Sequence, residues 1–496
     1  MAIRRNSFVN LAGAIAGLVL FAALTPLYFH VIGAERYGIL GIIWVFLTFF
    51  AAFDFGMGAA LTYRIANEAR SDIALQADYF WTALAISLPV GLVAGAVLFG
   101  LVGGGFGNFF KLTPAVSAEL LHSALPLFAI GVSTILLTTI NGFLIGREFF
   151  MANAVLGAVG PALSILLPVL AALLISPSLH ILILATLAGR AIMVLAGILI
   201  SQFMALQGTR PGISVRSARA LADYGVWMSI GGMIELAVSS ADRFILGLVA
   251  GPAAVGYYTV PASVLARVMI FPTSLGTVAL PQMASRSAEE ETILARKVIA
   301  MVGMLTPCFV AGEFLAEPFL RLWMGSTFAR IATLPMQLLL PAFWMEAIAA
   351  ILYFRLLAQG RPKTSAAVAA VIILPYCLLM YVLASGWGVA GACVAYIGRD
   401  LMFLGGRIAV TRSWRLMAAA VGPEALSLVV ALVICLFAWP TQPPMFVGII
   451  VTAASIALAW WRRPAEFDTM ISDLRRGLIT RLAKPVVLDA ESGLDG

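Results

Sequence analysis

Ionisable side chains interrupt several long apolar segments of this 496-residue chain, and their chemistry needs an explanation. A charge in the middle of a bilayer is costly, so it usually faces a cavity or a partner of opposite charge. These residues can therefore pair across helices or bind a charged ligand. Those near the middle of a segment are Arg190, Glu235, Arg267, Glu346, Arg399 and Asp400, and those nearer the ends are Asp54, Asp242, Arg243, Glu313, Arg355 and Arg407.

Six of these residues are cations and six are anions, so the pattern alone does not establish a cationic cavity. All six cations are arginines, whose planar guanidinium group can bind a phosphate through two parallel hydrogen bonds. For an anionic ligand we predict Arg267 and Arg243 as the first partners, with Arg190 next. A structural ion pair between Arg267 and Glu235 is the alternative that the sequence leaves open.

The polar residues around these arginines indicate which helices should line a cavity. On one segment, four polar residues at spacings of four, seven and eight share a broad helical face, namely Glu235, Ser239, Asp242 and Arg243. The corresponding segments of the first half offer Asn10, His30 and Asp54, and no basic residue at mid-depth. The predicted cavity residues are therefore Asn10, Asp54, Arg190, Glu235, Asp242, Arg243 and Arg267.

The elements that carry these residues follow from composition. The chain is 62% hydrophobic and 11% charged, with a mean hydropathy of +1.01, whereas about a quarter of an average soluble protein is charged. Lipid offers backbone groups no hydrogen-bond partner, so long apolar runs must be helices. We predict an all-α integral membrane bundle of about fourteen spans, at 7–31, 37–62, 79–104, 118–146, 150–176, 180–206, 223–250, 255–284, 294–316, 333–358, 364–385, 388–411, 423–440 and 445–462.

The two halves of the chain resemble copies of one another. Gly13, Gly33, Gly38 and Gly58 recur 218 residues later as Gly231, Gly251, Gly256 and Gly276. An even number of spans separates the copies, which predicts parallel repeats around a central cavity. The predicted parts are an N-lobe at 1–206, a polar linker at 207–221, a C-lobe at 222–411, a last helix pair at 412–462 and a tail at 463–496.

Basic residues predict the orientation. With a cytoplasmic amino terminus, twenty-one Lys and Arg fall on the cytoplasmic side and four, Arg36, Lys111, Arg321 and Arg330, fall outside. Both termini are therefore predicted to be cytoplasmic, and the net charge of +7 reflects this bias and not nucleic-acid binding. In the tail, apolar residues at helical spacing between 467 and 482 predict an amphipathic helix on the cytoplasmic leaflet, with a helix that docks on a partner as the alternative.

Neither enzyme motifs nor metal-ligand spacings stand out. The sequence contains no Gly-rich phosphate loop followed by Lys, the three His are scattered, and the four Cys lack metal-ligand or disulfide spacing. We therefore predict no enzymatic activity, no cofactor and no metal. Trp323, near the end of a span, is predicted to be an interfacial anchor.

Short motifs in both halves resemble those of bacterial polysaccharide flippases. They lie at residues 10–13, 33–38, 54–58, 241–247, 255–258 and 322–325. The resemblance implies the multidrug/oligosaccharidyl-lipid/polysaccharide exporter fold in a bacterial inner membrane. It also implies a flippase for an oligosaccharide linked to undecaprenyl pyrophosphate, which supplies O-antigen, capsule or exopolysaccharide synthesis, with a polysaccharide polymerase and export machinery as partners.

Three alternatives stay open within or beside this superfamily. A cation-coupled multidrug antiporter usually has twelve helices, and several bacterial ones have a carboxylate in the first helix, which is missing here. A lipid II flippase would carry basic residues on its first two helices, and this chain has none there at mid-depth. A membrane polymer ligase or polymerase would need a larger outer loop than 317–332.

Overall fold

The computed structural model describes residues 2–52, 54, 56–67, 72–210, 212–438, 443 and 445–463. Helix is the regular structure throughout these ranges, so the predicted all-α bundle is confirmed. Within them, nine helices are long and apolar enough to cross a membrane, or ten if α10 and α11 form one span. The total of fourteen spans stays a prediction, and the predicted tail helix lies outside the described residues.

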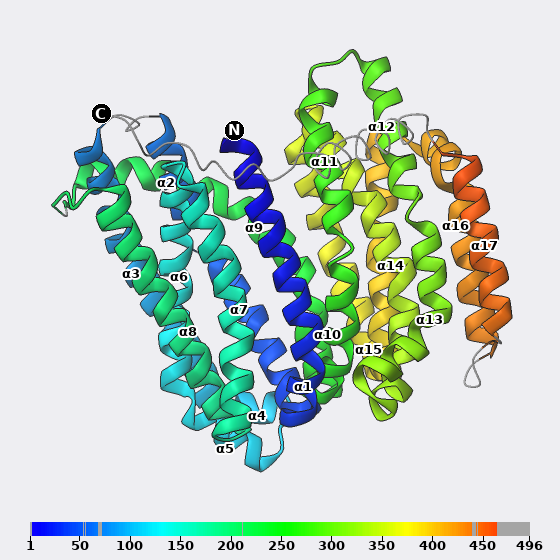
Figure 1. The fold of residues 1–496 in the computed structure, drawn as a ribbon, viewed down its shortest axis with the longest axis horizontal. Helices are drawn as coiled ribbons and strands as arrows, with labels where there is room; N and C mark the ends of the chain where they lie inside the picture. Colours follow the sequence, from blue (N-terminus) through cyan, green and yellow to red (C-terminus); the bar gives the residue numbers. More distant parts are fainter. Residues whose placement is uncertain are drawn as a thin grey trace, which may run out of the picture. The chain divides into compact units, whose positions relative to one another are not determined.

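The chain divides into two compact units, and the first contains Met1–Val268, Ala316–Ala342 and Lys363–Phe403. In it, α3 packs against α6, α7 packs against α8, and α1 packs against α7, α9 and α10. Figure 1 shows α3, α6, α7 and α8 running alongside one another, with the short α4 and α5 at one end. The helices that lie wholly in this unit are α1 (Ala2–Ala52), α2 (Met57–Asn67), α3 (Ile73–Gly103), α4 (Phe106–Phe109), α5 (Pro114–His122), α6 (Ala124–Gly146), α7 (Phe150–Leu174), α8 (Leu179–Leu199), the π-helical turn η1 (Ile200–Ala205), α9 (Val215–Ala250) and α10 (Pro252–Ala266).

The second unit contains Met269–Leu315, Phe343–Pro362 and Leu404–Gly496. Within it, α12 packs against α11 and α16, and α16 packs against α17. Helices α13, α14 and α15 contribute residues to both units. The helices of this part of the chain are α11 (Ile270–Ala284), α12 (Ala288–Gly303), α13 (Thr306–Met324), α14 (Ser326–Ala358), α15 (Pro362–Thr411), α16 (Trp414–Ala438) and α17 (Met445–Trp461).

A buried ion pair lies inside the second unit. The guanidinium group of Arg355 donates to both carboxylate oxygens of Glu291 at 2.7 and 2.9 Å and to Ser413 Oγ at 2.6 Å. Burial of both charged groups is tolerated because each is paired and hydrogen-bonded. Arg355 on α14 is therefore paired with a carboxylate of another helix, Glu291 on α12.

Two predicted spans contain a break in the helix. The predicted spans 7–31 and 37–62 are separated by a kink at Gly33, as expected, but the second of them is interrupted around Asp54 before α2 begins. The predicted span 255–284 is also interrupted, because α10 ends at Ala266 and α11 begins at Ile270. An apolar run predicts where a span lies, but it does not show where the backbone hydrogen bonds of the helix are interrupted.

The repeated glycines adopt the same backbone conformation in the two halves. Gly33 has φ 80° and ψ 165°, and Gly251, 218 residues later, has φ 81° and ψ 170°. These backbone angles lie in a region that residues other than glycine rarely adopt. The two helix pairs therefore turn at equivalent points, which supports the predicted repeat.

A second glycine pair makes reciprocal contacts within the first unit. A side chain at Gly38 would collide with the Pro252 carbonyl group, and one at Gly256 would come within 2.8 Å of the Ala34 carbonyl oxygen. Ala34 and Pro252 are themselves 218 residues apart, as are Gly38 and Gly256. Contacts that are exchanged in this way are typical of a two-fold relation between equivalent elements.

The first half carries an ion pair beside the Gly33 turn. Arg36 donates to both carboxylate oxygens of Glu119 on α5, at 2.6 and 2.9 Å, and Glu119 also accepts from the backbone N–H of Leu179 at 2.7 Å. The hydrogen bond from Arg36 is the main reason that the pKa of Glu119 is lowered. α5 lies outside the helices that are long enough to cross a membrane.

The predicted lobes are defined by the sequence repeat and its linker, whereas the two compact units are defined by contacts in the structure. α9 begins at Val215, so part of the predicted 207–221 linker is helical. Within the first unit, Arg64 donates to the Ala220 carbonyl oxygen, and the Ser214 N–H donates to Thr82 Oγ1. The predicted lobes at 1–206 and 222–411 stay a prediction.

Candidate functional site

Arg267 lies at the interruption between α10 and α11. Its backbone N–H bonds to the Val264 carbonyl oxygen at 3.2 Å, so α10 tightens and ends there. The guanidinium carbon lies 4.2 Å from the centre of the Phe21 ring on α1, and Nε is buried without a hydrogen-bond partner among the described residues. A cation at the carboxyl end of a helix is favoured by the helix dipole.

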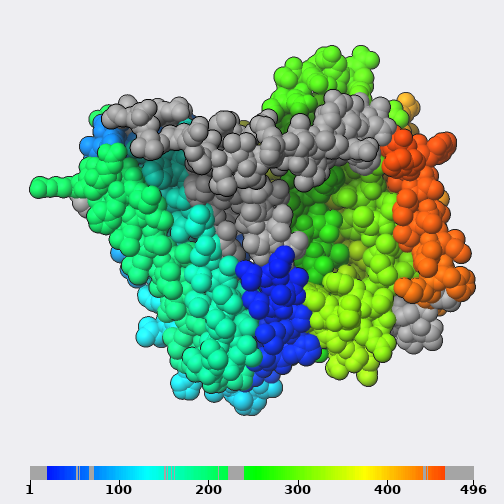
Figure 2. Space-filling model, in the orientation of Figure 1, coloured from blue at the N-terminus to red at the C-terminus, as the bar shows by residue number. Residues whose placement is uncertain are grey.

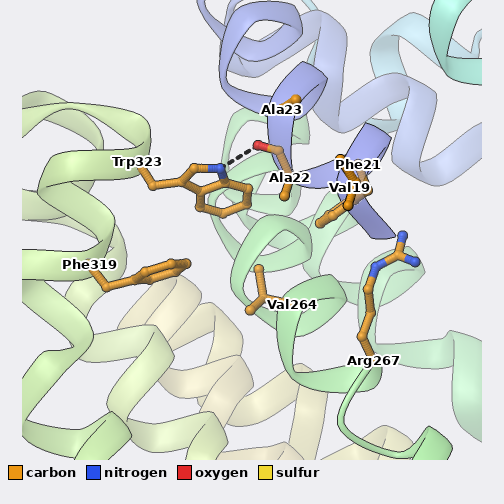
Figure 3. A pocket seen from close by; sticks show the side chains of 8 residues that line it. All are labelled: Val19, Phe21, Ala22, Ala23, Val264, Arg267, Phe319 and Trp323. Atoms are coloured by element: carbon orange, nitrogen blue, oxygen red, sulfur yellow. Dashed lines mark hydrogen bonds between the residues drawn. The ribbon is translucent and has the colours of Figure 1, made fainter. Parts of the chain in front are cut away.

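A cavity of about 470 Å³ opens beside this guanidinium group. Figure 3 shows its wall of apolar and aromatic side chains, with Arg267 on one side and Trp323 on the other. Val19 on α1, which lines the cavity, is 60% exposed, and the space-filling view shows the described part of α1 at the surface (Figure 2). The residues that line it are Val19, Phe21, Ala22, Ala23, Val264, Arg267, Phe319 and Trp323.

Trp323 is held against α1 by a hydrogen bond. Its indole Nε1 donates to the Ala22 carbonyl oxygen at 2.6 Å. In a regular helix that carbonyl would accept from residue 26, but Pro26 has no N–H to donate. The sequence interpretation of Trp323 as an interfacial anchor therefore missed this role. The signal that could have revealed it is Pro26 inside a helix, because such a proline leaves the carbonyl group four residues earlier without a backbone donor.

Tyr37 connects Arg267 to a second predicted arginine. The buried phenol of Tyr37 interacts electrostatically with the guanidinium groups of both Arg243 and Arg267. Nε of Arg243 is buried and, like that of Arg267, has no hydrogen-bond partner among the described residues. The structure thus brings two of the predicted arginines to the same region of α1, α9 and α10.

Asp242 contributes to a different, buried cluster. One carboxylate oxygen accepts from the Tyr258 hydroxyl at 2.6 Å, and the other accepts from the Arg243 backbone N–H at 2.8 Å. It also interacts electrostatically with Tyr376 of α15. On the same helix, Arg399 pairs with Asp400 at 2.8 Å. Asp242 is therefore satisfied by protein groups and is not one of the residues that line the cavity at Arg267.

Asp54 and Arg190 have local hydrogen-bond partners. Asp54 accepts from the backbone N–H groups of Gly56 and Gly58 at 2.7 and 3.2 Å, as a cap at the start of α2. Arg190 on α8 donates to Thr134 Oγ1 on α6 at 2.7 Å. These contacts give both residues a structural role in the first half of the chain.

Two predicted cavity residues cannot be placed. The side chains of Asn10 and Glu235 lie outside the described residues. The alternative pairing of Arg267 with Glu235 therefore stays a prediction. Within the described ranges, no three His, Cys, Asp or Glu side chains lie close enough together to hold a metal ion.

Sequence comparisons relate the chain to a polysaccharide biosynthesis family and to two bacterial proteins. A family model described as "Polysaccharide biosynthesis protein" matches residues 31–333, more than half of the chain. The Shigella flexneri protein named "Putative O-antigen transporter" is 23% identical over 418 residues, which is 81% of this chain and 96% of that protein. The Bacillus subtilis (strain 168) protein named "Uncharacterized membrane protein EpsK" is 24% identical over 348 residues, 66% of each chain.

Solved structures share the fold at low sequence identity. The lipid II flippase MurJ in an inward closed conformation has a TM-score of 0.66 at 12% identity, and the match covers 96% of this chain and 99% of MurJ. An inward-facing multidrug resistance MATE family transporter of the MOP superfamily has a TM-score of 0.64 at 14% identity, over 82% of this chain and 98% of that one. The predicted exporter fold is therefore confirmed.

Proposed function

The chain belongs to the polysaccharide biosynthesis protein family, and from this premise we propose that it flips an oligosaccharide linked to undecaprenyl pyrophosphate from the cytoplasmic to the periplasmic leaflet. The Shigella flexneri relative, named as an O-antigen transporter, supports a surface polysaccharide as the end product. A polysaccharide polymerase and export machinery would then consume the flipped repeat unit.

The observation that carries this proposal is the position of Arg267. Its guanidinium group borders a cavity at the interruption between α10 and α11, while one of its nitrogens has no protein partner among the described residues. Interrupted helices often form the binding sites of transporters with repeated halves. A pyrophosphate that crosses the membrane loses its hydration, and a fixed guanidinium group would replace part of it through charge-assisted hydrogen bonds.

Arg243 would be the second cation for the pyrophosphate. It interacts electrostatically with Tyr37, as Arg267 does, so the two guanidinium groups share one neighbour. Two cations in one region suit a linkage that carries more than one negative charge. Asp242, Asp54 and Arg190 already have protein partners and are proposed to support the fold around the site.

The mechanism we infer is alternating access between the two halves. The reciprocal contacts of Gly38 and Gly256 lie beside the Gly33 and Gly251 turns, at the end of the helices predicted to face outside. Close packing there supports a form that is closed toward the periplasm. Opening would separate these contacts, so that the headgroup crosses through the cavity while the lipid chain stays near the bilayer.

A flipping assay with purified protein tests the proposal. Vesicles would contain a lipid-linked oligosaccharide with a fluorescent sugar, and a membrane-impermeant quencher would report the fraction exposed on the outer leaflet. Arg267→Ala should be folded but at least about tenfold slower, because each hydrogen bond to a charged group is worth about 1.5–3 kcal/mol. Arg267→Lys should recover only part of the rate, because it keeps the charge but loses bidentate geometry.

Arg330→Ala is the matched control, because Arg330 is an exposed arginine of α14 that does not line the cavity. It should flip at the wild-type rate. Flipping by the wild-type protein no faster than in empty vesicles would refute the proposed function. A wild-type rate for Arg267→Ala would remove Arg267 from the site.

A further inference from the structure

The cavity at Arg267 has two chemically different parts. One end carries a guanidinium group, which is the only charged group among the described residues that line the cavity. The rest of the wall is hydrocarbon or aromatic, with Phe21 and Val264 near Arg267 and with Phe319 and Trp323 across the cavity (Figure 3). A site of this kind is suited to an amphiphile, whose charged group and apolar chain need different surroundings.

The aromatic part of the wall is held in place by ring contacts and a hydrogen bond. The rings of Phe319 and Trp323 stack with centres 5.4 Å apart and planes 26° apart, and the Trp323 ring also contacts Phe21 at 6.2 Å. The Trp323 indole N–H is used by the Ala22 carbonyl oxygen, which Pro26 leaves without a backbone donor. Because tryptophan has only this one donor, the rings present apolar faces to the cavity.

Such a wall discriminates between the two ends of a lipid-linked sugar. Sugar hydroxyls placed against it would lose their hydrogen bonds to water without replacement, which is unfavourable. An apolar chain would be stabilised by the same contact, because its surface would pack against fixed aromatic rings and away from water. The chemistry of the wall therefore favours the chain over the sugar.

We propose that this cavity holds the isoprenyl units that lie next to the pyrophosphate of the substrate, with the phosphate on Arg267 and the chain against Phe319 and Trp323. This inference rests on the proposed function and deepens it, because it assigns the aromatic wall to the lipid part of the substrate. The protein would then recognise the junction that all substrates with this carrier share. The sugars would extend away from the wall.

Phe319 is the residue on which to test the assignment. It is 38% exposed and lines the cavity, and its truncation would leave the hydrogen bond between Trp323 and Ala22 in place. Phe99 on α3 is the matched control, because it is 50% exposed and does not line this cavity. Phe319→Leu is a second variant that keeps apolar bulk but removes the aromatic face.

The experiment measures binding of two probes, farnesyl diphosphate and inorganic pyrophosphate, to the full chain in lipid nanodiscs by calorimetry, with empty nanodiscs subtracted. Wild-type protein should bind farnesyl diphosphate at least about tenfold more tightly than pyrophosphate, because only the former buries apolar surface. Phe319→Ala should lose about five- to tenfold in affinity for farnesyl diphosphate and keep its affinity for pyrophosphate. Phe319→Leu should lose about two- to threefold, and Phe99→Ala should change neither affinity.

The outcomes separate this inference from the function on which it rests. Arg267→Ala should lower the affinity for both probes. If it lowers neither affinity, the proposed phosphate site itself is wrong. If Arg267→Ala weakens both but Phe319→Ala and Phe319→Leu bind farnesyl diphosphate like the wild type, only the assignment of the chain is overturned. Equal affinity of the wild type for the two probes would overturn it as well. A loss of affinity for a nucleotide sugar in Phe319→Ala would instead place the sugar on this wall.

Discussion

The second predicted span of each half, 37–62 and 255–284, is interrupted, and the residues at the two interruptions carry opposite charges. In the first half, Asp54 stands before α2, and in the second half, Arg267 stands after α10. With the repeat distance of 218 residues, Arg267 corresponds to position 49, which is about one and a half helical turns before Asp54. Each charge also suits its place, because helix amino ends favour anions and carboxyl ends favour cations.

The two residues differ in how fully the protein uses them. The Asp54 carboxylate accepts from two backbone N–H groups at the start of α2, so it is used as a helix cap at the interruption. Arg267 has a ring contact and borders a cavity, and its Nε has no hydrogen-bond partner among the described residues. Equivalent positions of a repeat can thus carry a structural residue in one half and a candidate ligand-binding residue in the other.

The largest expected effect concerns flipping by Arg267 variants. If Arg267 binds substrate, Arg267→Ala should keep wild-type abundance and lose at least about tenfold in rate. If it instead pairs with Glu235, Arg267→Ala should lower the abundance, and the double variant with Glu235→Ala should restore both abundance and export. Immunoblots of membranes beside the vesicle assay distinguish the two accounts, and normal export by Arg267→Ala would contradict both.

The next effect tests the symmetry between the halves. Gly38→Ala should destabilise the protein by about 3 kcal/mol, because its new methyl group would collide with the Pro252 carbonyl group. Gly256→Ala should cost less, about 1–2 kcal/mol, because its nearest atom, the Ala34 carbonyl oxygen, would be 2.8 Å away.

Thermal melting in detergent measures this difference. Gly405→Ala is the control, because no atom lies within 4 Å of a side chain added at that position. Equal melting temperatures for Gly38→Ala and the wild type would show that the reciprocal contact is looser than the structure indicates.

Asp54→Ala should destabilise the protein by about 2 kcal/mol, because two backbone N–H groups at the start of α2 lose their acceptor. Asp54→Asn should cost less, since its amide oxygen can still accept one hydrogen bond. Melting temperature and membrane abundance measure both variants. Wild-type stability together with lost export in Asp54→Ala would show that Asp54 acts on the substrate and that the two interruptions are more alike than we infer.

The smallest effect concerns the ion pair that only the first half carries, since Arg36 corresponds to Ala254 in the second half. Glu119→Gln should lower stability by about 1 kcal/mol at neutral pH. Because the pKa of Glu119 is lowered in the folded protein, its contribution is present above the unfolded-state pKa of about 4.3 and is lost as the pH falls through the folded-state pKa.

Melting curves from pH 7 to pH 3 measure this dependence. The difference between the wild type and Glu119→Gln should stay constant near neutral pH and shrink below about pH 4. A difference that does not change with pH would mean that the charge of Glu119 does not contribute.

Sequence alone was sufficient to predict the class of the protein and the residues that needed an explanation. Apolar runs of spanning length must be helical in lipid, so the all-α bundle follows from composition and length. The glycine repeat predicted two related halves, and the nearly identical backbone angles of Gly33 and Gly251 support it. Arg267 was also selected from sequence, because a cation at mid-span is costly wherever it lies.

The roles of the individual charges depended on tertiary contacts. Asp54 and Asp242 were predicted from sequence as cavity residues, but backbone N–H groups and the Tyr258 hydroxyl satisfy them. Trp323 bonds to Ala22, which is 301 residues away in the chain, to complete the cavity wall beside Arg267. Hydrophobicity is a property of each segment, so sequence determines it, whereas the partner of a buried polar group depends on which distant segments the fold brings together.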